Sequence, residues 1–168
     1  MVERRRKGKR GPDDPTDQRA IEHRAVQLLS RREHSAHELS HKLEQKGFER
    51  DAVRAVVARL ETRKWQSDAR FADVFFRQRV QQGYGPLRIR AELQHKGVDE
   101  DEIQRVFEAE DVDWFALARE RFQRRFPHPV DAADRRKEQA RRMRYLAQRG
   151  FTGEQVRSAL DSSLEDPI

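Results

Sequence analysis

The apolar residues of this chain fall at helical spacing, in an arrangement that occurs three times. Counted from a glycine, apolar residues lie at positions −4, +1, +6 and +10, a basic residue at −1 and an acidic residue at +4. Because apolar residues three and four apart form one face of a helix, each copy predicts two helices joined at its glycine. The glycines are 50 and 53 residues apart, which indicates a tandem array. The structural repeat positions are Gly47, Gly97 and Gly150, with Leu43, Leu93 and Leu146 at −4.

Each repeat also carries signals for the ends of its helices. A glycine after a basic last turn is predicted to end the helix in the left-handed conformation, and the apolar residue behind it folds back onto that turn. A capping residue followed three positions later by Glu or Gln predicts the start of a helix. Such pairs are Ser35 with Glu38, Asp99 with Glu102, and Thr152 with Gln155.

These signals predict an all-α chain of nine helices in three groups of three. The predicted helices span 18–31, 35–46, 49–62, 68–82, 86–96, 99–110, 112–126, 131–149 and 152–162. The corresponding parts are a disordered basic leader at 1–17, helical repeats at 18–65, 66–111 and 112–162, and a short tail at 163–168. Trp65 and Trp114 stand near the starts of new repeats, and we expect them in the core between repeats rather than as stacking platforms.

Composition narrows the classes of protein to which this chain can belong. An apolar content of 35% beside 39% charged residues cannot build a thick core in 168 residues, so thin helical layers are expected. The absence of cysteine excludes disulfides and thiolate metal sites. No apolar run approaches the roughly 18 residues that span a bilayer, and no secretory signal is visible. We therefore expect a cytoplasmic protein that does not enter membranes.

Charge is distributed unevenly along the chain. Of the net charge of +6, residues 1–10 alone carry +5. Residues 97–113 carry eight acids against one arginine, whereas residues 116–150 carry eleven bases against four acids. A basic stretch of this size can bind phosphates or an acidic protein surface, and such binding would weaken with salt. The alternative interpretation is a solvated helix face.

One motif resembles a zinc-protease signature, because residues 37–41 read His-Glu-Leu-Ser-His. Leu39 and Leu43 commit the apolar face of this helix to the core of the array, so both histidines are expected on its more exposed side. No third ligand or substrate cleft follows downstream. No P-loop, nucleophile elbow or cysteine nucleophile is present either. We therefore expect no catalytic residues, no cofactor and no metal.

The second repeat resembles the central region of bacterial RecX proteins. The sequence pattern typical of these proteins is an acidic residue before Phe-Ala, paired arginines, and then Tyr-Gly-Pro, Ile, Leu and Gly at fixed spacings. The matching residues are Asp68, Arg70, Phe71, Ala72, Phe75, Arg77, Arg79, Gly83, Tyr84, Gly85, Pro86, Ile89, Glu92, Leu93, Lys96 and Gly97. With the three repeats and the length, the resemblance covers nearly the whole chain after about residue 18.

The resemblance implies an elongated, curved array of three three-helix repeats whose partner is the RecA filament on single-stranded DNA. It implies a regulator, without enzymatic activity of its own, that suppresses the ATPase, strand exchange and coprotease activities of RecA. Some family members also bind DNA directly. A monomer is expected. The alternative is a non-specific DNA-binding helical repeat protein without a role specific to RecA.

Several residues are predicted to contact the partner, either the RecA filament or DNA. Tyr84 lies on a rigid turn and is a candidate contact, although covering the core is the favoured interpretation. Planar guanidinium groups could grip carboxylates or phosphates. On the eighth helix, an arginine stripe recurs every seven residues, and Met143, Leu146 and Ala147 are predicted to form the buried side. The arginines of the set are Arg77, Arg79, Arg135, Arg142 and Arg149.

Overall fold

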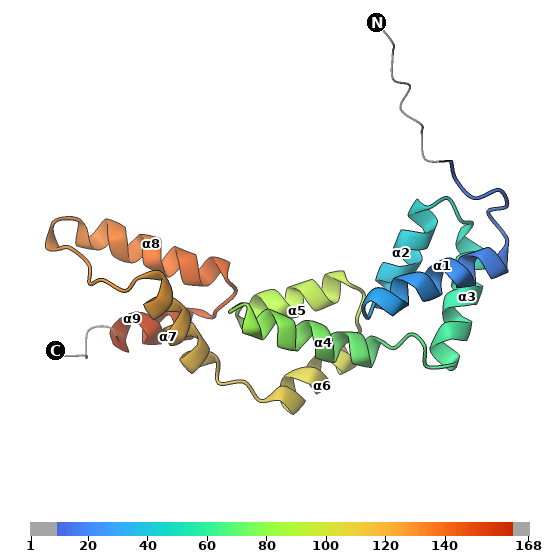
Figure 1. Cartoon of the computed structure of the whole chain (residues 1–168). Helices are drawn as coiled ribbons and strands as arrows, with labels where there is room; N and C mark the ends of the chain where they lie inside the picture. Colours follow the sequence, from blue (N-terminus) through green and yellow to red (C-terminus); the bar gives the residue numbers. More distant parts are fainter. Residues whose placement is uncertain (1–9, 163–168) are drawn as a thin grey trace, which may run out of the picture. The chain divides into compact units, whose positions relative to one another are not determined.

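The computed structural model describes residues 10–162, and within this range the chain is helical without any strand (Figure 1). The helices are α1 (Gln18–Arg31), α2 (Ala36–Gln45), α3 (Arg50–Thr62), α4 (Asp68–Gln81), α5 (Pro86–His95), α6 (Glu100–Glu110), α7 (Trp114–Arg125), α8 (Arg135–Gln148) and α9 (Gly153–Ser162). A 3₁₀ turn, η1 (Ala132–Asp134), precedes α8. Contacts divide the chain into unit 1 (Met1–Phe71) and unit 2 (Ala72–Ile168). None of the helices in residues 10–162 is long and apolar enough to cross a membrane.

The predicted helix stops are confirmed at all three repeat glycines. Their φ angles are 101° at Gly47, 77° at Gly97 and 97° at Gly150. In the first repeat, the N–H of Gly47 donates to the carbonyl of Glu44 at 2.9 Å, and the next N–H, of Phe48, reaches back to Leu43 at 3.4 Å. This pair of bonds is the Schellman motif, and the other two repeats form the same pair. The repeated leucine is thus the residue to which the chain returns after each stop.

The predicted helix starts are also confirmed. Ser35, Asp99 and Thr152 each accept a hydrogen bond from the backbone N–H three residues on, at 3.1, 3.0 and 3.3 Å. At Thr152 the cap is reciprocal, because its own N–H donates to the side chain of Gln155 at 2.9 Å. The eighth helix is shorter than predicted, since residues 132–134 form η1 and the α-helix begins at Arg135.

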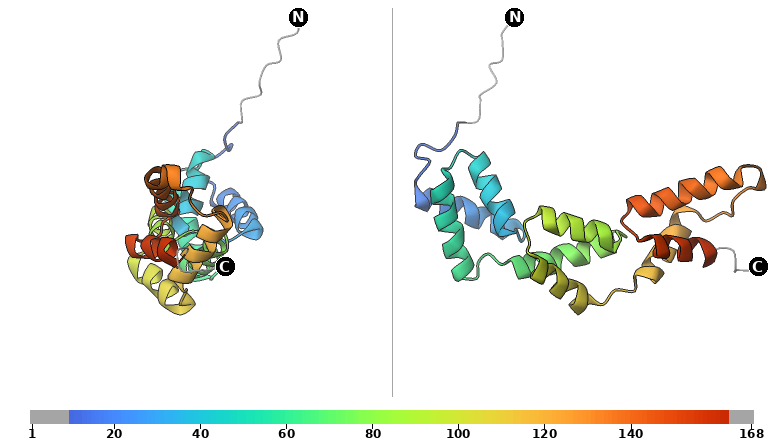
Figure 2. Two further views of the ribbon diagram at one scale, coloured as in Figure 1. Left: turned by 90° about the vertical axis from the view of Figure 1, so that its left-hand side faces the viewer. Right: turned by 180° about the vertical axis from the view of Figure 1, so that it is seen from behind.

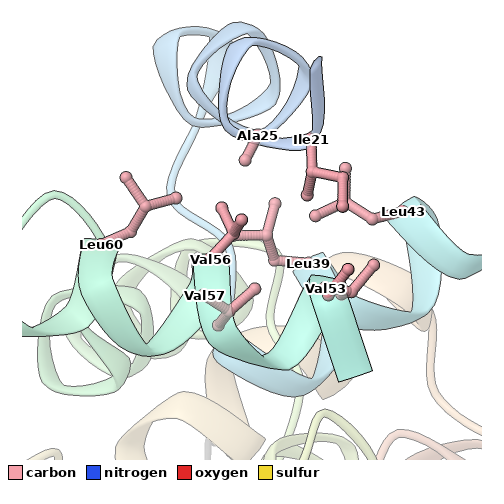
Figure 3. Packing of buried hydrophobic residues seen from close by; sticks show 9 residues of the cluster. Ile21, Ala25, Leu39, Leu43, Val53, Val56, Val57 and Leu60 are labelled. Carbon is pink, nitrogen blue, oxygen red and sulfur yellow. The ribbon is translucent and has the colours of Figure 1, made fainter. Parts of the chain in front are cut away.

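Unit 1 is a three-helix layer around one small core. Figure 3 shows the apolar side chains of α1, α2 and α3 pointing toward one another. Ile21, Leu39, Leu43 and Val53 are fully buried there. The loop after α3 is fastened to α2, because the N–H of Ala36 donates to Asp68 at 2.8 Å. The core therefore consists of one apolar face from each of the three helices, and it includes the leucine predicted from the repeat.

Unit 2 contains α4 from Ala72 onward and the helices α5 to α9 (Figure 2). Trp114, at the start of α7, lies 5.8 Å from the rings of Phe76 in α4 and Phe107 in α6. The expectation that Trp114 packs between repeats is confirmed. The same expectation for Trp65 is wrong, because 56% of its surface is exposed. Trp65 follows Lys64 in the left-handed turn that ends α3, and this turn directs it to solvent.

Residues 10–17 follow a defined course against the turn between α2 and α3, although the leader was predicted to be disordered to residue 17. A Cβ at Gly47 would lie only 2.9 Å from Cδ of Pro12, so the two residues are in close contact. The N–H of Glu49 donates to the carbonyl of Pro15 at 2.8 Å. We call residues 10–17 the strap. Residues 1–9 of the predicted leader and the tail at 163–168 lie outside the described residues.

Candidate functional site

Three of the predicted partner contacts meet at the junction between α4–α5 and α8–α9. Tyr84 is half-buried between two arginines, with the guanidinium of Arg88 4.1 Å and that of Arg149 4.2 Å from its ring centre. Arg79 lies 5.4 Å from the same ring and pairs with Glu92 at 2.7 Å. The aromatic ring is thus held inside a cluster of cations.

The backbone joins the same two segments directly. The N–H of Gly85 donates to the carbonyl of Arg149 at 2.7 Å, and the N–H of Leu87 donates to the carbonyl of Gly150 at 2.9 Å. The Nε of Arg149 donates to the carbonyl of Gly83 at 3.0 Å. These contacts form the joint between repeats 2 and 3. The Tyr-Gly-Pro turn therefore docks onto the helix stop of the following repeat.

Two arginines of the joint were missed in the sequence analysis. Arg88 lies over Tyr84 and bonds Glu92 at 2.9 Å, and Arg121 of α7 donates to the carbonyl of Gln82. The glycine at position 83 leaves space for the side chain of Arg121, because any side chain at that position would overlap the guanidinium. Arg88 and Glu92 form an i,i+4 pair within α5, which is a local signal in the sequence. Arg121 has no such signal, because the Gln82 carbonyl lies 39 residues away.

The buried side predicted for α8 is confirmed only at Leu146, and Arg142 is buried in place of the two other predicted residues. Only 8% of Arg142 is exposed, whereas Met143 is 42% exposed and Ala147 also faces solvent. The Arg142 guanidinium bonds Glu138 at 3.2 Å and the carbonyl of His128 at 2.9 Å. It also lies 4.8 Å from the ring centre of Phe126. Arg142 is therefore part of the core of repeat 3, with the aliphatic stem packed and the charge satisfied.

Most of the other basic residues of α8 reach solvent. Glu138 accepts hydrogen bonds from Arg141 and Arg142, which lower the pKa of its carboxyl to about 2. The remaining bases of the helix are exposed, and Arg77 of α4 is also 61% exposed while pairing with Glu110 at 2.9 Å. The exposed α8 bases without a role in the joint or the core are Arg135, Arg136, Lys137 and Arg144.

The histidine motif on α2 has a structural role at its centre. Glu38 is buried and accepts two hydrogen bonds from Arg32, at 2.9 and 3.1 Å, while His37 and His41 are exposed as expected. Among residues 10–162, no group of three or more His, Cys, Asp or Glu side chains is arranged to hold a metal ion.

His34 is the buried histidine of unit 1, with 2% of its surface exposed. Its Nδ1 lies 3.0 Å from the carbonyl of Arg32, and its Nε2 lies 3.2 Å from the ammonium of Lys42. A carbonyl only accepts and an ammonium only donates, so Nδ1 carries the proton and Nε2 accepts. Burial, together with the charges of Arg32 and Lys42, lowers the pKa of His34 against the opposing effects of the Arg32 carbonyl bond and Glu38.

Comparisons with known proteins agree with this architecture. The family models "RecX, first three-helix domain", "second" and "third" match residues 23–60, 67–106 and 111–160. The regulatory protein RecX of Xanthomonas oryzae pv. oryzae is 46% identical over 145 residues, which cover 85% of this chain and 87% of that protein. That of Halorhodospira halophila is 43% identical over 147 residues, covering 88% and 90%.

Solved structures show the same fold. A crystal structure of RecX from Lactobacillus salivarius has a TM-score of 0.69 at 18% identity, over 87% of this chain and 96% of that one. A second crystal structure, of regulatory protein RecX, has a TM-score of 0.72 at 21% identity, over 86% and 73%. The chain belongs to the RecX family of regulatory proteins.

Proposed function

We propose that this protein binds the RecA filament on single-stranded DNA and inhibits the ATPase, strand exchange and coprotease activities of RecA. It would thereby modulate homologous recombination and the SOS response, as a cytoplasmic monomer with no enzymatic activity. The observation that carries the proposal is the match of all three RecX domain models, in order, along one chain. The relatives named regulatory protein RecX support it over 85% of the sequence.

The exposed cations of unit 2 are the proposed contacts with the filament. Arg135 and Arg77 remain on this surface, whereas Arg142 and Arg149 already serve the core and the joint. We therefore add Arg136, Lys137 and Arg144 to the proposed contact set. Exposed cations of this kind steer association with an acidic surface and fix its orientation. Arg79 and Tyr84 lie within the joint, so they would affect partner binding by fixing the shape of the joint.

Repeated contacts explain how such a protein could prefer filament to free RecA. When two or more binding surfaces on one chain meet neighbouring protomers, the second contact forms within the complex. Modest individual affinities then give strong binding to the polymer and weak binding to the single subunit. A DNA-binding protein without a role specific to RecA gains no such preference.

The deciding experiment measures the ATPase activity of RecA that depends on single-stranded DNA. RecA and DNA are held fixed while this protein is added below the RecA concentration. A filament regulator suppresses ATPase in this range, because one molecule acts on many protomers. A DNA competitor acts only when enough protein is present to cover the lattice, and its effect falls steeply with salt. Suppression that appears only at lattice saturation would contradict the proposal.

A further inference from the structure

Unit 1 contains a groove where α1, α2 and the strap meet. The groove has a volume of about 630 Å³. From α1 come Arg24 and Leu28, which are one turn apart. Lys42 of α2 and Lys46, which caps the end of that helix, have the same spacing. Its lining is Arg10, Gly11, Arg24, Leu28, Lys42, Gln45 and Lys46, which includes four cations and no acid.

This concentration of charge is not typical of the rest of unit 1. Residues 10–71 contain thirteen lysines and arginines against eleven acids, so the remainder of the unit is slightly acidic once the groove is set aside. Elsewhere in the unit, arginines pair with acids. Examples are Arg32 with Glu38 at 2.9 Å, Arg63 with Glu22 at 3.0 Å and Arg70 with Glu33 at 3.0 Å. The groove is therefore a local concentration of positive charge.

The strap completes the groove. Contact of Pro12 with Gly47, and the hydrogen bond from Glu49 to the Pro15 carbonyl at 2.8 Å, place Arg10 and Gly11 along its edge. Arg10 is also the last residue of a leader that carries six bases and one acid in residues 1–10. The cationic lining thus continues, in the sequence, into the most basic segment of the chain.

Lys42 is oriented at the groove by His34. The Nε2 of the neutral His34 ring accepts a hydrogen bond from the Lys42 ammonium at 3.2 Å. The charged and titratable groups around the ring are Arg32, Glu38 and Lys42. His34 therefore contacts one residue of the groove lining, and we expect its ring to report an anion that binds to Lys42.

We propose that this groove binds the phosphate groups of a nucleic-acid strand without reading its bases. Four cations in one open channel match a ligand whose negative charges recur along its length. No aromatic residue lines the groove, so bases have no stacking platform and recognition rests on the backbone alone.

The test measures binding of a labelled 20-nucleotide oligo(dT) by fluorescence anisotropy over a series of salt concentrations. The groove variant is Arg24→Gln with Lys46→Gln, and the matched control is Arg50→Gln with Arg54→Gln, two exposed arginines one turn apart on α3. Loss of two phosphate contacts lowers the slope of log K against log salt by about 1.4, since each contact on single strands contributes about 0.7. The control keeps the parent slope. Equal slopes for parent and groove variant would overturn the proposal.

A second readout follows the His34 ring by NMR while oligo(dT) is added to the full chain. Its resonances shift in the parent and in the control, and in the groove variant the same shift requires a higher concentration of oligo(dT). The variant Arg10→Gln, which lies outside every helix, gives a slope lower by about 0.7 and keeps the proposal testable if the double variant loses structure. An unchanged His34 signal in the parent at saturating oligonucleotide would place binding elsewhere.

Competition experiments distinguish nucleic acids from free phosphate and from an acidic polypeptide. Unlabelled duplex DNA and RNA of equal length compete through the same groove, and inorganic phosphate competes only at far higher concentration. Poly-glutamate of matched charge competes poorly if the groove prefers phosphates, and competition as strong as that of oligo(dT) would contradict the proposal. RecA is absent from all these assays, so their failure is distinguishable from failure of the proposed inhibition of RecA.

Discussion

Gly85 lies against the backbone of Gly150, and no side chain fits at this position. Its φ of −85° suits any residue, so the requirement for glycine comes from space. A Cβ at Gly85 would overlap the Gly150 carbonyl and lie 2.5 Å from the amide nitrogen of Phe151. Backbone atoms on both sides of the joint cannot move aside without breaking the two hydrogen bonds that connect the segments.

We therefore predict that Gly85→Ala destabilises unit 2 by about 2 kcal/mol or more, from overpacking and lost joint bonds. Urea unfolding followed by circular dichroism measures the change. The control is Gly153→Ala, at the start of α9, where the nearest side-chain atom lies 3.7 Å away on flexible Arg157. That control should be neutral or slightly stabilising. If Gly85→Ala were as stable as the parent, the close contact of Gly85 with Gly150 would not be required for the stability of unit 2.

His34 predicts a pH dependence of the stability of unit 1. Because its pKa is lowered in the folded chain, the unfolded chain takes up a proton as the pH falls through about 6.5, before the folded chain does. The contribution of His34 to the free energy of unfolding is therefore largest above pH 6.5. It decreases as the pH falls from 6.5 toward the pKa of His34 in the folded state. Urea midpoints between pH 7.5 and 5 should show this loss.

The variant His34→Gln removes the titrating ring and should flatten this part of the pH profile. His37→Gln removes an exposed histidine from α2 and should leave the profile as in the parent. NMR titration of the His34 ring provides the direct check. A ring that protonates at or above pH 6.5 in the folded protein would refute the assignment of Nε2 as an acceptor.

Helix ends were predictable from the sequence because their signals are local. The stop at Gly47 needs only a left-handed residue and an apolar one behind it, and the start after Thr152 needs only Gln155 three residues on. The buried face of α8 was not predictable in this way. Its sequence offers Met143 and Ala147 as apolar residues, yet Arg142 is buried because its partners, the His128 carbonyl and Phe126, lie outside the helix.

Arg142 accordingly has a predicted role in holding α8. The variant Arg142→Ala should destabilise unit 2 by about 2 kcal/mol, because the His128 carbonyl loses its donor and the ring of Phe126 loses its cover. Thermal unfolding measures the effect. Arg144→Ala, exposed on the same helix, should change stability by less than about 0.5 kcal/mol. Arg142→Lys keeps the charge but cannot reproduce the planar donor pair, so it should recover only part of the loss.

The long-range contacts were the least predictable part of the structure. The Tyr-Gly-Pro turn was recognised as rigid, but nothing near it in the sequence indicates that it docks at Gly150, 65 residues away. The strap was hidden for the same reason, since Pro12 meets Gly47 only after α1 and α2 have folded. Candidate sites chosen from arginine spacing therefore mixed surface residues with residues of the joint and the core.

The groove of unit 1 and the exposed bases of α8 consist of different residues, which predicts that binding of DNA and inhibition of RecA can be altered independently. The variant Lys137→Glu with Arg144→Glu reverses two exposed charges on α8 and leaves the core contacts of Arg142 intact. It should raise the concentration for half-inhibition of RecA ATPase about tenfold, equivalent to about 1.4 kcal/mol, by weakening electrostatic complementarity with the filament.

The groove variant Arg24→Gln with Lys46→Gln provides the reciprocal comparison. It should lose salt-dependent affinity for oligo(dT) while still suppressing RecA ATPase below the RecA concentration, because its α8 surface is unchanged. The α8 variant should keep its salt slope with oligo(dT) and lose inhibition. If instead both variants lost inhibition in proportion to their loss of DNA affinity, inhibition would operate through the DNA, and the protein would compete for the lattice on which RecA assembles.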